Sequence, residues 1–189
     1  MSEDLEFLLS KPEIQALLKK HPTTQSVISI YDIAADSFGQ GEISLAAIGE
    51  LTNVLHLAFN VLDYIDRIPY GYLAHDDLQG YVVRNGITEI GPVAFHGCKE
   101  LVKVTIPSTV EYIGTSAFGD CPNLRFINLK SNNITWDPHT VFERTKYIDK
   151  IYFDGSKADW ERLWEDEPQP ANTIICWDGE IKRVNLKRI

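Results

Sequence analysis

The residues of this sequence with the greatest capacity for chemistry are two histidines and two cysteines at related spacings. His75, Cys98 and Cys121 are each 23 residues apart, and His96 stands two positions before Cys98. Imidazole and thiolate are ligands that zinc prefers, and a cysteine beside a histidine can also act as a nucleophile with its base. If the spacing reflects a structural repeat, His75, Cys98 and Cys121 would stack in one column and could form a metal or thiol site.

A structural role explains the same column with fewer requirements. Free cysteine is among the most buried residue types and packs as a small hydrophobe. A zinc site would need a fourth ligand, for which only His96 is nearby, and that side chain is expected to point the other way. Cys176 lies alone and is expected to be structural as well. We therefore predict buried, reduced thiols and no metal site, and a thiol or metal enzyme is the least favoured hypothesis.

Other catalytic patterns are missing from the sequence. It contains no Gly-rich phosphate loop, no G-x-S-x-G turn and no H-E-x-x-H helix. The acidic pair Asp76–Asp77 and the acidic residues 165–167 fall in or beside expected loops without a convergent base. We therefore predict no catalytic residues and no cofactor, and we do not expect an enzyme.

The region around the two cysteines is internally repetitive. Residues 87–129 match themselves when the sequence is shifted by 23 positions, and every matching column is apolar or cysteine. A period of roughly 20–29 residues built on L-x-x-L-x-L is the signature of a leucine-rich repeat solenoid. Strands are expected at residues 102–106 and 125–129, and stacking of neighbouring units would bury their apolar faces. The matching pairs are Ala94 and Ala117, Phe95 and Phe118, Cys98 and Cys121, Leu101 and Leu124, Val104 and Ile127, and Ile106 and Leu129.

The match continues in both directions along the chain. Downstream, a shift of 24 residues places Ile148, Ile151 and Phe153 in the same columns, and upstream a shift of 23 places Tyr72 under Phe95. The array then has about four repeats, which is enough for the roughly three that a stable solenoid needs.

The segment VTIPSTVEYIGTSAFGDCPNL closely resembles the BspA-like leucine-rich repeat, also called the Treponema pallidum type. Its unit runs as an I-P step, V-x-x-I-G, A-F and C-x-x-L, and residues 151–163 look like the segment that often closes such arrays. The resemblance covers roughly residues 61–165 and implies a leucine-rich repeat solenoid. It also implies a role like that of other members, which are mostly bacterial surface or secreted adhesion proteins. The residues that carry the unit are Ile106-Pro107, Val110, Ile113-Gly114, Ala117-Phe118, Cys121 and Leu124.

The segment before the repeats is expected to be helical and to cap the first repeat. Ser10-Lys11-Pro12-Glu13 has the spacing of a capping box, and Gly39 and Gly41 are expected to end a later helix. An open solenoid end exposes apolar side chains and strand edges, which explains the need for a cap.

The segment after the repeats predicts a helix and a hairpin. Ser156 and Asp159 provide a helix start, after which Trp160 and Trp164 would lie on one face and plug the last repeat. Residues 173–177 and 180–184 alternate around Asp178-Gly179, which is a hairpin signal. The predicted fold is therefore α+β, with a helical region at 1–62, a leucine-rich repeat array at 63–155 and a C-terminal cap of helix and hairpin at 156–189.

Charge and cysteine content narrow the classes of function. The formal net charge is −9, and residues 1–60 carry eight acids against three lysines. This argues against direct nucleic-acid binding, which requires a basic surface. No apolar run approaches the roughly 20 residues of a membrane span, and the acidic start MSEDLEFLLS does not resemble a signal peptide. With three cysteines and no C-x-x-C, we predict a cytoplasmic protein without a membrane anchor.

The outward positions of the strands are the remaining candidate site. In L-x-x-L-x-L the x positions point away from the core, and exposed aromatic and cationic side chains favour an interface. The sequence therefore predicts a non-enzymatic module that binds a protein partner, of bacterial or phage origin and of undetermined oligomeric state. An alternative is an acidic inhibitor, from a phage or mobile element, of a nucleic-acid-binding or defence enzyme. The predicted partner-binding residues are Lys103, Arg125, Phe126, Asn128, Lys150 and Tyr152.

Overall fold

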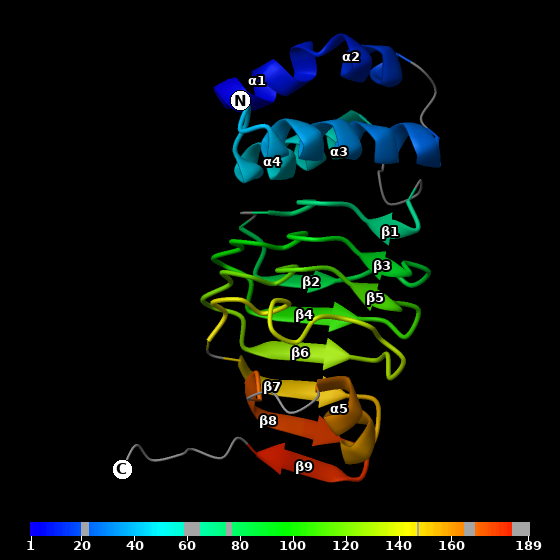
Figure 1. The fold of residues 1–189 in the computed structure, drawn as a ribbon, viewed down its shortest axis with the longest axis vertical. Coiled ribbons are helices and arrows are strands. Elements are labelled where there is room, and N and C mark those ends of the chain that lie inside the picture. The colour runs from blue at the N-terminus through cyan, green and yellow to red at the C-terminus, as the bar shows by residue number, and fades with distance from the viewer. Residues whose placement is uncertain (20–22, 59–64, 75–76, 147, 165–168, 183–189) are drawn as a thin grey trace.

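The chain folds into a stack that runs from four helices at one end to a β-hairpin at the other (Figure 1). The computed structural model describes residues 1–19, 23–58, 65–74, 77–146, 148–164 and 169–182. The helices precede a β-solenoid, so the predicted α+β solenoid with a helical N-terminal region is confirmed. Position 63, the expected start of the array, lies outside the described residues.

The N-terminal helices form two layers (Figure 1). Helix α3 begins with a capping box between Thr23 and Ser26 and ends at Gly39. The predicted cap at Ser10 is wrong, because Ser10 is the last residue of α1 and its hydroxyl donates to the carbonyl of Phe7. The next helix starts instead on a proline at its first position. The helices are α1 (Glu3–Ser10), α2 (Pro12–Leu18), α3 (Thr24–Gly39) and α4 (Leu45–Ala58).

Helix α4 packs directly on the first solenoid coil. A Cβ atom at Gly49 would collide with the carbonyl oxygen of Ala74, so only glycine allows this close approach. The hydroxyl of Tyr31, on α3, forms a 2.8 Å hydrogen bond with Thr52, and the Thr52 hydroxyl donates to the carbonyl of Tyr72. All of these groups are buried, so the helices and the first coil share one core.

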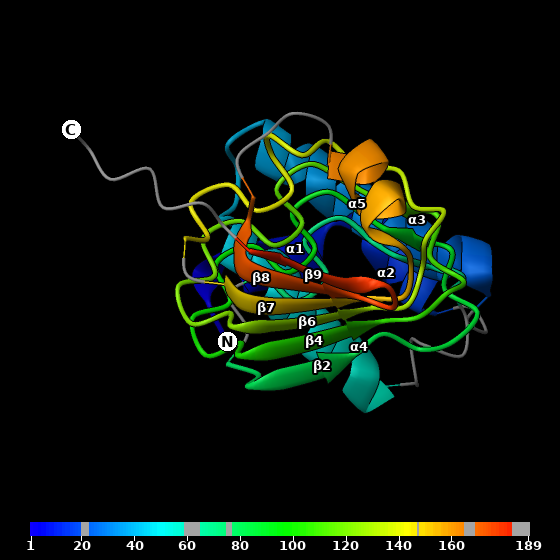
Figure 2. The same cartoon turned by 90° about the horizontal axis from the view of Figure 1, so that it is seen from below.

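The solenoid strands form two sheets, one along each of two sides of the stack. Seen along the stack, the six-stranded sheet lies on one side and α5 (Lys157–Trp164) lies across the core from it (Figure 2). The six-stranded sheet has the order β2 (Gly80–Val82), β4 (Lys103–Ile106), β6 (Phe126–Leu129), β7 (Ile148–Phe153), β8 (Ala171–Cys176) and β9 (Gly179–Lys182). Its pairs are parallel except β8 with β9.

A second sheet of two-residue strands explains the Ile-Gly step of the repeat. It contains β1 (Arg67–Ile68), β3 (Glu89–Ile90) and β5 (Tyr112–Ile113), and a glycine follows β3 and β5. A Cβ atom at Gly114 would lie 2.8 Å from the Cα atom of Pro92 in the preceding coil. The glycine is therefore needed because neighbouring backbones pass too closely for any side chain.

An aromatic column runs through the core parallel to the stack. The rings of Phe95 and Phe118 are 5.1 Å apart and nearly parallel, and Phe142 lies 6.0 Å from Phe118. On the other side, the described ring next to Phe95 is Tyr81, at 5.1 Å. The predicted pairing of Tyr72 with Phe95 is wrong by one residue, because backbone hydrogen bonds align Leu73 with Phe95.

The C-terminal segment forms the predicted helix and hairpin, but its strand continues the solenoid sheet. Ser156 and Asp159 cap α5 reciprocally, and Trp160 and Trp164 are buried. The hairpin loop is Trp177-Asp178, one residue earlier than predicted, because Cys176 pairs with Gly179. Strand β8 pairs in parallel with β7, which places it where a further repeat strand would lie.

Candidate functional site

The predicted binding residues lie on the outward side of the six-stranded sheet, which we call the strand face. One row across the strands contains Lys103, Phe126 and Lys150, and the next contains Thr105, Asn128 and Tyr152. The residues between them, such as Ile127, are buried. The register therefore brings five of the six predicted residues together in two adjacent rows.

The exposure of these residues differs along the face. Lys103, Lys150 and Tyr152 are exposed, whereas Phe126 and Asn128 are half-buried. The Asn128 amide donates to the hydroxyl of Thr105 over 3.3 Å, so it is held across two strands. A partner could therefore reach the two lysines and the tyrosine directly, whereas the phenylalanine and the asparagine between them are partly covered.

The sixth predicted residue, Arg125, lies just before β6 and is half-buried. Its guanidinium donates to the carbonyl oxygens of Pro122 and Leu124 at 3.0 and 3.4 Å. The arginine therefore stabilises its own turn. To contact a partner, its guanidinium would have to break these hydrogen bonds and form new ones with the partner.

Strands β8 and β9 extend the face beyond the predicted residues. Thr173 continues the Lys150 row, Ile175 continues the Tyr152 row, and Lys182 and Glu180 follow on β9. The sequence signal for this extension is the same shift of 23 residues, which maps Ile148, Ile151 and Phe153 onto Ala171, Ile174 and Cys176. The face is therefore six strands wide, and its last two strands were not predicted to belong to it.

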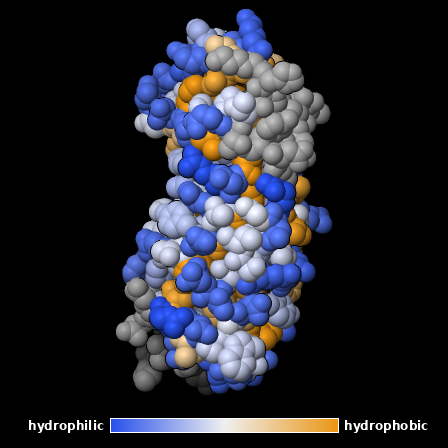
Figure 3. Space-filling view, turned by 90° about the vertical axis from the view of Figure 1, so that its right-hand side faces the viewer, coloured by the Kyte–Doolittle hydropathy of each residue, from blue (hydrophilic) through white to orange (hydrophobic). Residues whose placement is uncertain are grey.

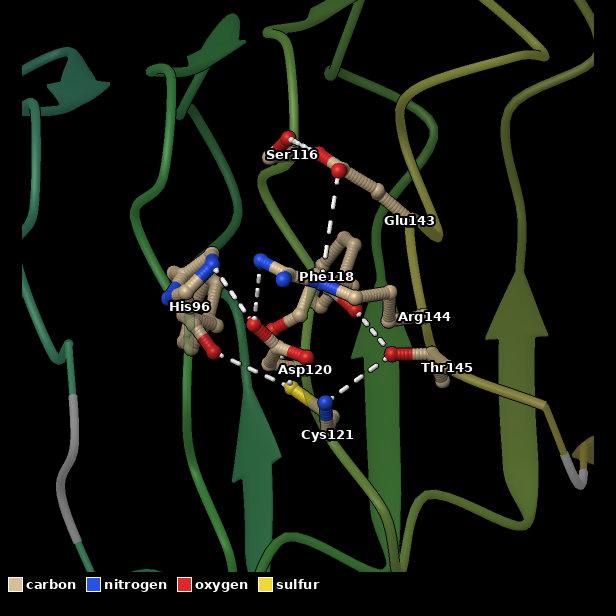
Figure 4. A network of polar contacts seen from close by, with 10 residues as sticks. His96, Ser116, Phe118, Asp120, Cys121, Glu143, Arg144 and Thr145 are labelled. Atoms are coloured by element: carbon tan, nitrogen blue, oxygen red, sulfur yellow. Dashed lines mark hydrogen bonds and ion pairs between the residues drawn. The ribbon is translucent and has the colours of Figure 1, made fainter.

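The cysteine column forms a hydrogen-bond ladder inside the solenoid (Figure 4). The thiol of Cys98 donates to the carbonyl of Leu73 at 2.9 Å, and the thiol of Cys121 donates to that of Phe95 at 3.1 Å. In the next coil Thr145 takes the same position, and its hydroxyl donates to the carbonyl of Phe118 at 2.6 Å. A donor that satisfies a buried carbonyl explains why both cysteine and threonine occur in this column.

His96 takes part in a separate chain of contacts on the surface of the turns (Figure 4). Its Nε2 atom lies 3.3 Å from the Asp120 carboxylate, which also pairs with Arg144 at 2.8 Å. The nearby hydroxyl of Ser116 donates to Glu143 at 2.8 Å, not to the imidazole. A nucleophile must lie within reach of its base, and this arrangement pairs serine with glutamate and histidine with aspartate instead.

The metal hypothesis receives no geometric support from the part of the chain that the structure describes. No group of three histidine, cysteine, aspartate or glutamate side chains that could hold a metal ion occurs within the described ranges. His75, the third member of the predicted column, lies outside them. Between residues 1 and 182, leaving the gaps aside, no helix is long and apolar enough to cross a membrane.

We expect Cys98 and Cys121 to resist a thiol reagent in the native protein. Both are buried and both donate to backbone carbonyls. Cys176 is expected to react slowly as well, because burial and the nearby Asp178 carboxylate raise the pKa of its thiol and only the thiolate is reactive. The measurement is labelling with an aromatic disulfide, with the same sample in denaturant as the control in which all three react. Rapid native labelling of Cys98 and Cys121, or stoichiometric zinc in the purified protein, would contradict the structural role.

Comparison with known proteins agrees with the repeat geometry. A family model described as a BspA type leucine rich repeat region, of six copies, matches residues 66–159. No significant match was found among curated proteins or among solved structures. Leucine-rich repeat solenoids typically mediate protein–protein interaction and present an extended surface for it. The matched residues contain the Ile-Gly steps, the Ala-Phe column and the cysteine ladder, and through them the chain belongs to the BspA-type leucine-rich repeat family.

Proposed function

We propose that this chain is a non-enzymatic interaction module that binds a protein partner through the strand face. The observation that carries the proposal is the six-stranded width of this face, on which Tyr152 remains exposed between Asn128 and Ile175. Aromatic side chains contribute strongly to interfaces because they bury a large area at little cost in conformational entropy. A flat row of strands presents them in a fixed arrangement.

The charge of the strand face supports an acidic partner. Lys103, Lys150 and Lys182 lie in one row, whereas the whole chain carries a net charge of −9. Adjacent strands are about 4.8 Å apart, so these lysines repeat every two strands, about 9.6 Å. A partner with carboxylates would gain local complementarity, which salt is expected to weaken.

One other side of the molecule is less suited to tight binding by apolar contact. Viewed from the side at which the strands of Figure 1 end, hydrophobic atoms occur in short streaks between hydrophilic ones (Figure 3). Large exposed apolar patches mark interfaces, and this side presents none among the residues that the figure colours. Of these two surfaces, the strand face is therefore the stronger candidate.

The acidic helices support the alternative function, inhibition of a basic, nucleic-acid-binding or defence enzyme. Glu3, Glu6 and Glu13 are exposed on the outer helix layer. Asp4 is less available, since its carboxylate accepts the backbone N–H of Ser44, and hydrogen bonding to the side chain and the backbone of Ser44 lowers its pKa. We place either function in the cytoplasm, because three cysteines that form no disulfide suit reducing conditions.

The test begins with a partner captured from bacterial lysate and identified. The double variant Phe126→Ala with Tyr152→Ala is expected to weaken its binding at least tenfold, because desolvated aromatic residues often contribute about 2 kcal/mol or more each. Tyr112→Ala is the matched control, since Tyr112 is 41 % exposed and Tyr152 is 43 % exposed, but Tyr112 lies on the other sheet. Affinity is measured by calorimetry at two salt concentrations.

The competing surface is tested in the same experiment. Reversal of Glu3, Glu6 and Glu13 to lysine should leave binding intact, and Asp4 is left unchanged because it holds Ser44. If this reversal abolishes binding while the aromatic double variant binds normally, the helices are the working surface and the inhibitor function is favoured.

A further inference from the structure

The strand face ends in a hollow that the repeat pattern does not account for. The hollow has a volume of about 470 Å³ and lies where β6, β7 and β8 end. The outward row of Asn128, Tyr152 and Ile175 lines it, together with Lys130, Asp154 and Trp177, each of which directly follows the end of its strand. A concave region with aromatic walls thus opens at one edge of the proposed binding surface.

Trp177 is the most exposed aromatic residue along this hollow. Its side chain is 75 % exposed, although its backbone N–H donates to the carbonyl of Gly155 at 3.1 Å. The chain has four tryptophans, and the other three, Trp136, Trp160 and Trp164, are buried. The indole is exposed to water, but its backbone is already held by a hydrogen bond. A partner could therefore bury the indole at little cost in backbone entropy.

We propose that this hollow seats one large apolar side chain from an acidic segment of a protein partner. The proposal rests on the function proposed above and specifies which chemistry the partner must present. Tyr152 and Trp177 would enclose the apolar side chain, with half-buried Ile175 as the floor. Aromatic residues that a partner covers and desolvates contribute a large share of the affinity of an interface.

The charges beside the hollow specify the flanks of that segment. Lys130 lies on the rim, and Lys150 and Lys103 follow in the adjacent part of the face. Asp154 is the carboxylate among the described lining residues, and Glu180 on β9 lies beside Ile175, so both would repel an acidic chain. The segment is therefore expected to leave the hollow over Lys150 and Lys103, away from Asp154.

The hollow is not supplied by the repeat alone. Ile175 and Trp177 lie beyond residues 66–159, which the repeat family matches. The hairpin that carries them pairs with the last repeat strand, so the C-terminal segment adds a specific pocket to a general surface.

The four tryptophans provide the test. In a ¹⁵N-labelled sample, the indole N–H resonance of Trp177, assigned with Trp177→Phe, is followed during titration with a synthetic peptide. The probe peptide carries one central phenylalanine between glutamates, and two matched peptides carry alanine at the centre or lysines at the flanks. The first peptide is expected to shift the Trp177 resonance and leave the three buried indoles unchanged, whereas the matched peptides produce at most a third of that shift. The proposal would be overturned if the Trp177 resonance does not shift at peptide concentrations up to about 2 mM, where a Kd near about 1 mM would be detected. An equal shift with the lysine peptide would also overturn it. A shift with a single-stranded oligonucleotide that matches or exceeds that of the acidic peptide would point to nucleic acid and would also overturn it.

The captured partner separates this proposal from the broader one. Trp177→Ala should weaken its binding about tenfold or more, while Val82→Ala should not, because Val82 is 73 % exposed at the opposite edge of the same face. If Trp177→Ala binds normally and Phe126→Ala does not, the strand face binds without the hollow and this inference fails alone. If Trp177→Ala loses binding and Phe126→Ala alone does not, the hollow is the contact and the centre of the face is not.

Discussion

Replacing Phe118 with alanine is expected to lower the free energy of unfolding by about 3–5 kcal/mol. The ring is fully buried, with Phe95 at 5.1 Å on one side and Phe142 at 6.0 Å on the other. Each solenoid coil contacts only its neighbours, so a cavity in this column weakens two interfaces at once. Urea denaturation followed by circular dichroism measures the effect.

Phe7→Ala is the matched control for Phe118→Ala. Phe7 is 41 % exposed on α1, and the ammonium of Lys11 lies 4.8 Å from the centre of its ring. A surface substitution of this kind usually changes stability by about 0.5 kcal/mol or less. Equal midpoint shifts for the two variants would mean that the aromatic column does not carry the stability of the array.

The columns of the solenoid could be predicted because each is written several times in the sequence. A residue type that recurs every 23 or 24 positions in an apolar column has few structural explanations besides stacking. Ile127 and Ile151 were assigned inward on this basis, and the structure pairs them in register. The same register gives the outward residues by alternation, so the rows of the strand face followed once the inward residues were assigned.

The extension of the sheet into β8 could not be recognised as easily. Its inward positions hold Ala171 and Cys176, which are small, so the apolar column is weak there. Helix α5 also takes the place of the turns that precede the other strands, which removes the surrounding motif. The hollow was missed for the same reason, since Ile175 and Trp177 line it only when β8 lies beside β7.

Two details of the candidate site depend on contacts that spacing does not encode. Alternation placed Arg125 outward, but its guanidinium bonds to the carbonyls of its own turn. The cysteine column was predicted to be packing alone, whereas its thiols also satisfy carbonyls of the preceding coil. Hydrogen-bond partners in neighbouring coils are tertiary facts, and a pattern of apolar positions does not specify them.

Trp160→Ala is expected to destabilise the C-terminal end by about 3–5 kcal/mol. The indole is fully buried, stacks on Trp164 at 5.7 Å and meets the Phe153 ring edge-on at 5.3 Å. Its N–H also donates to the side-chain oxygen of Gln169 at 2.8 Å, which ties α5 to the segment before β8. Loss of this side chain removes one of the two buried indoles through which α5 packs on the last coils.

The effect should differ in kind from that of Phe118→Ala, because Trp160 lies near the end of the stack. Terminal units of a solenoid can unfold before the rest when their single interface is weakened. The buried Trp136 and Trp164 report on this end, so in Trp160→Ala the fluorescence transition in urea should precede the circular dichroism transition. Trp177→Ala is the control, since that indole is exposed, and its two transitions should coincide close to those of the unmodified protein. If the fluorescence and circular dichroism transitions of Trp160→Ala coincide at the midpoint of the control, α5 does not cap the array. The β8–β9 hairpin would then be the candidate for the C-terminal cap.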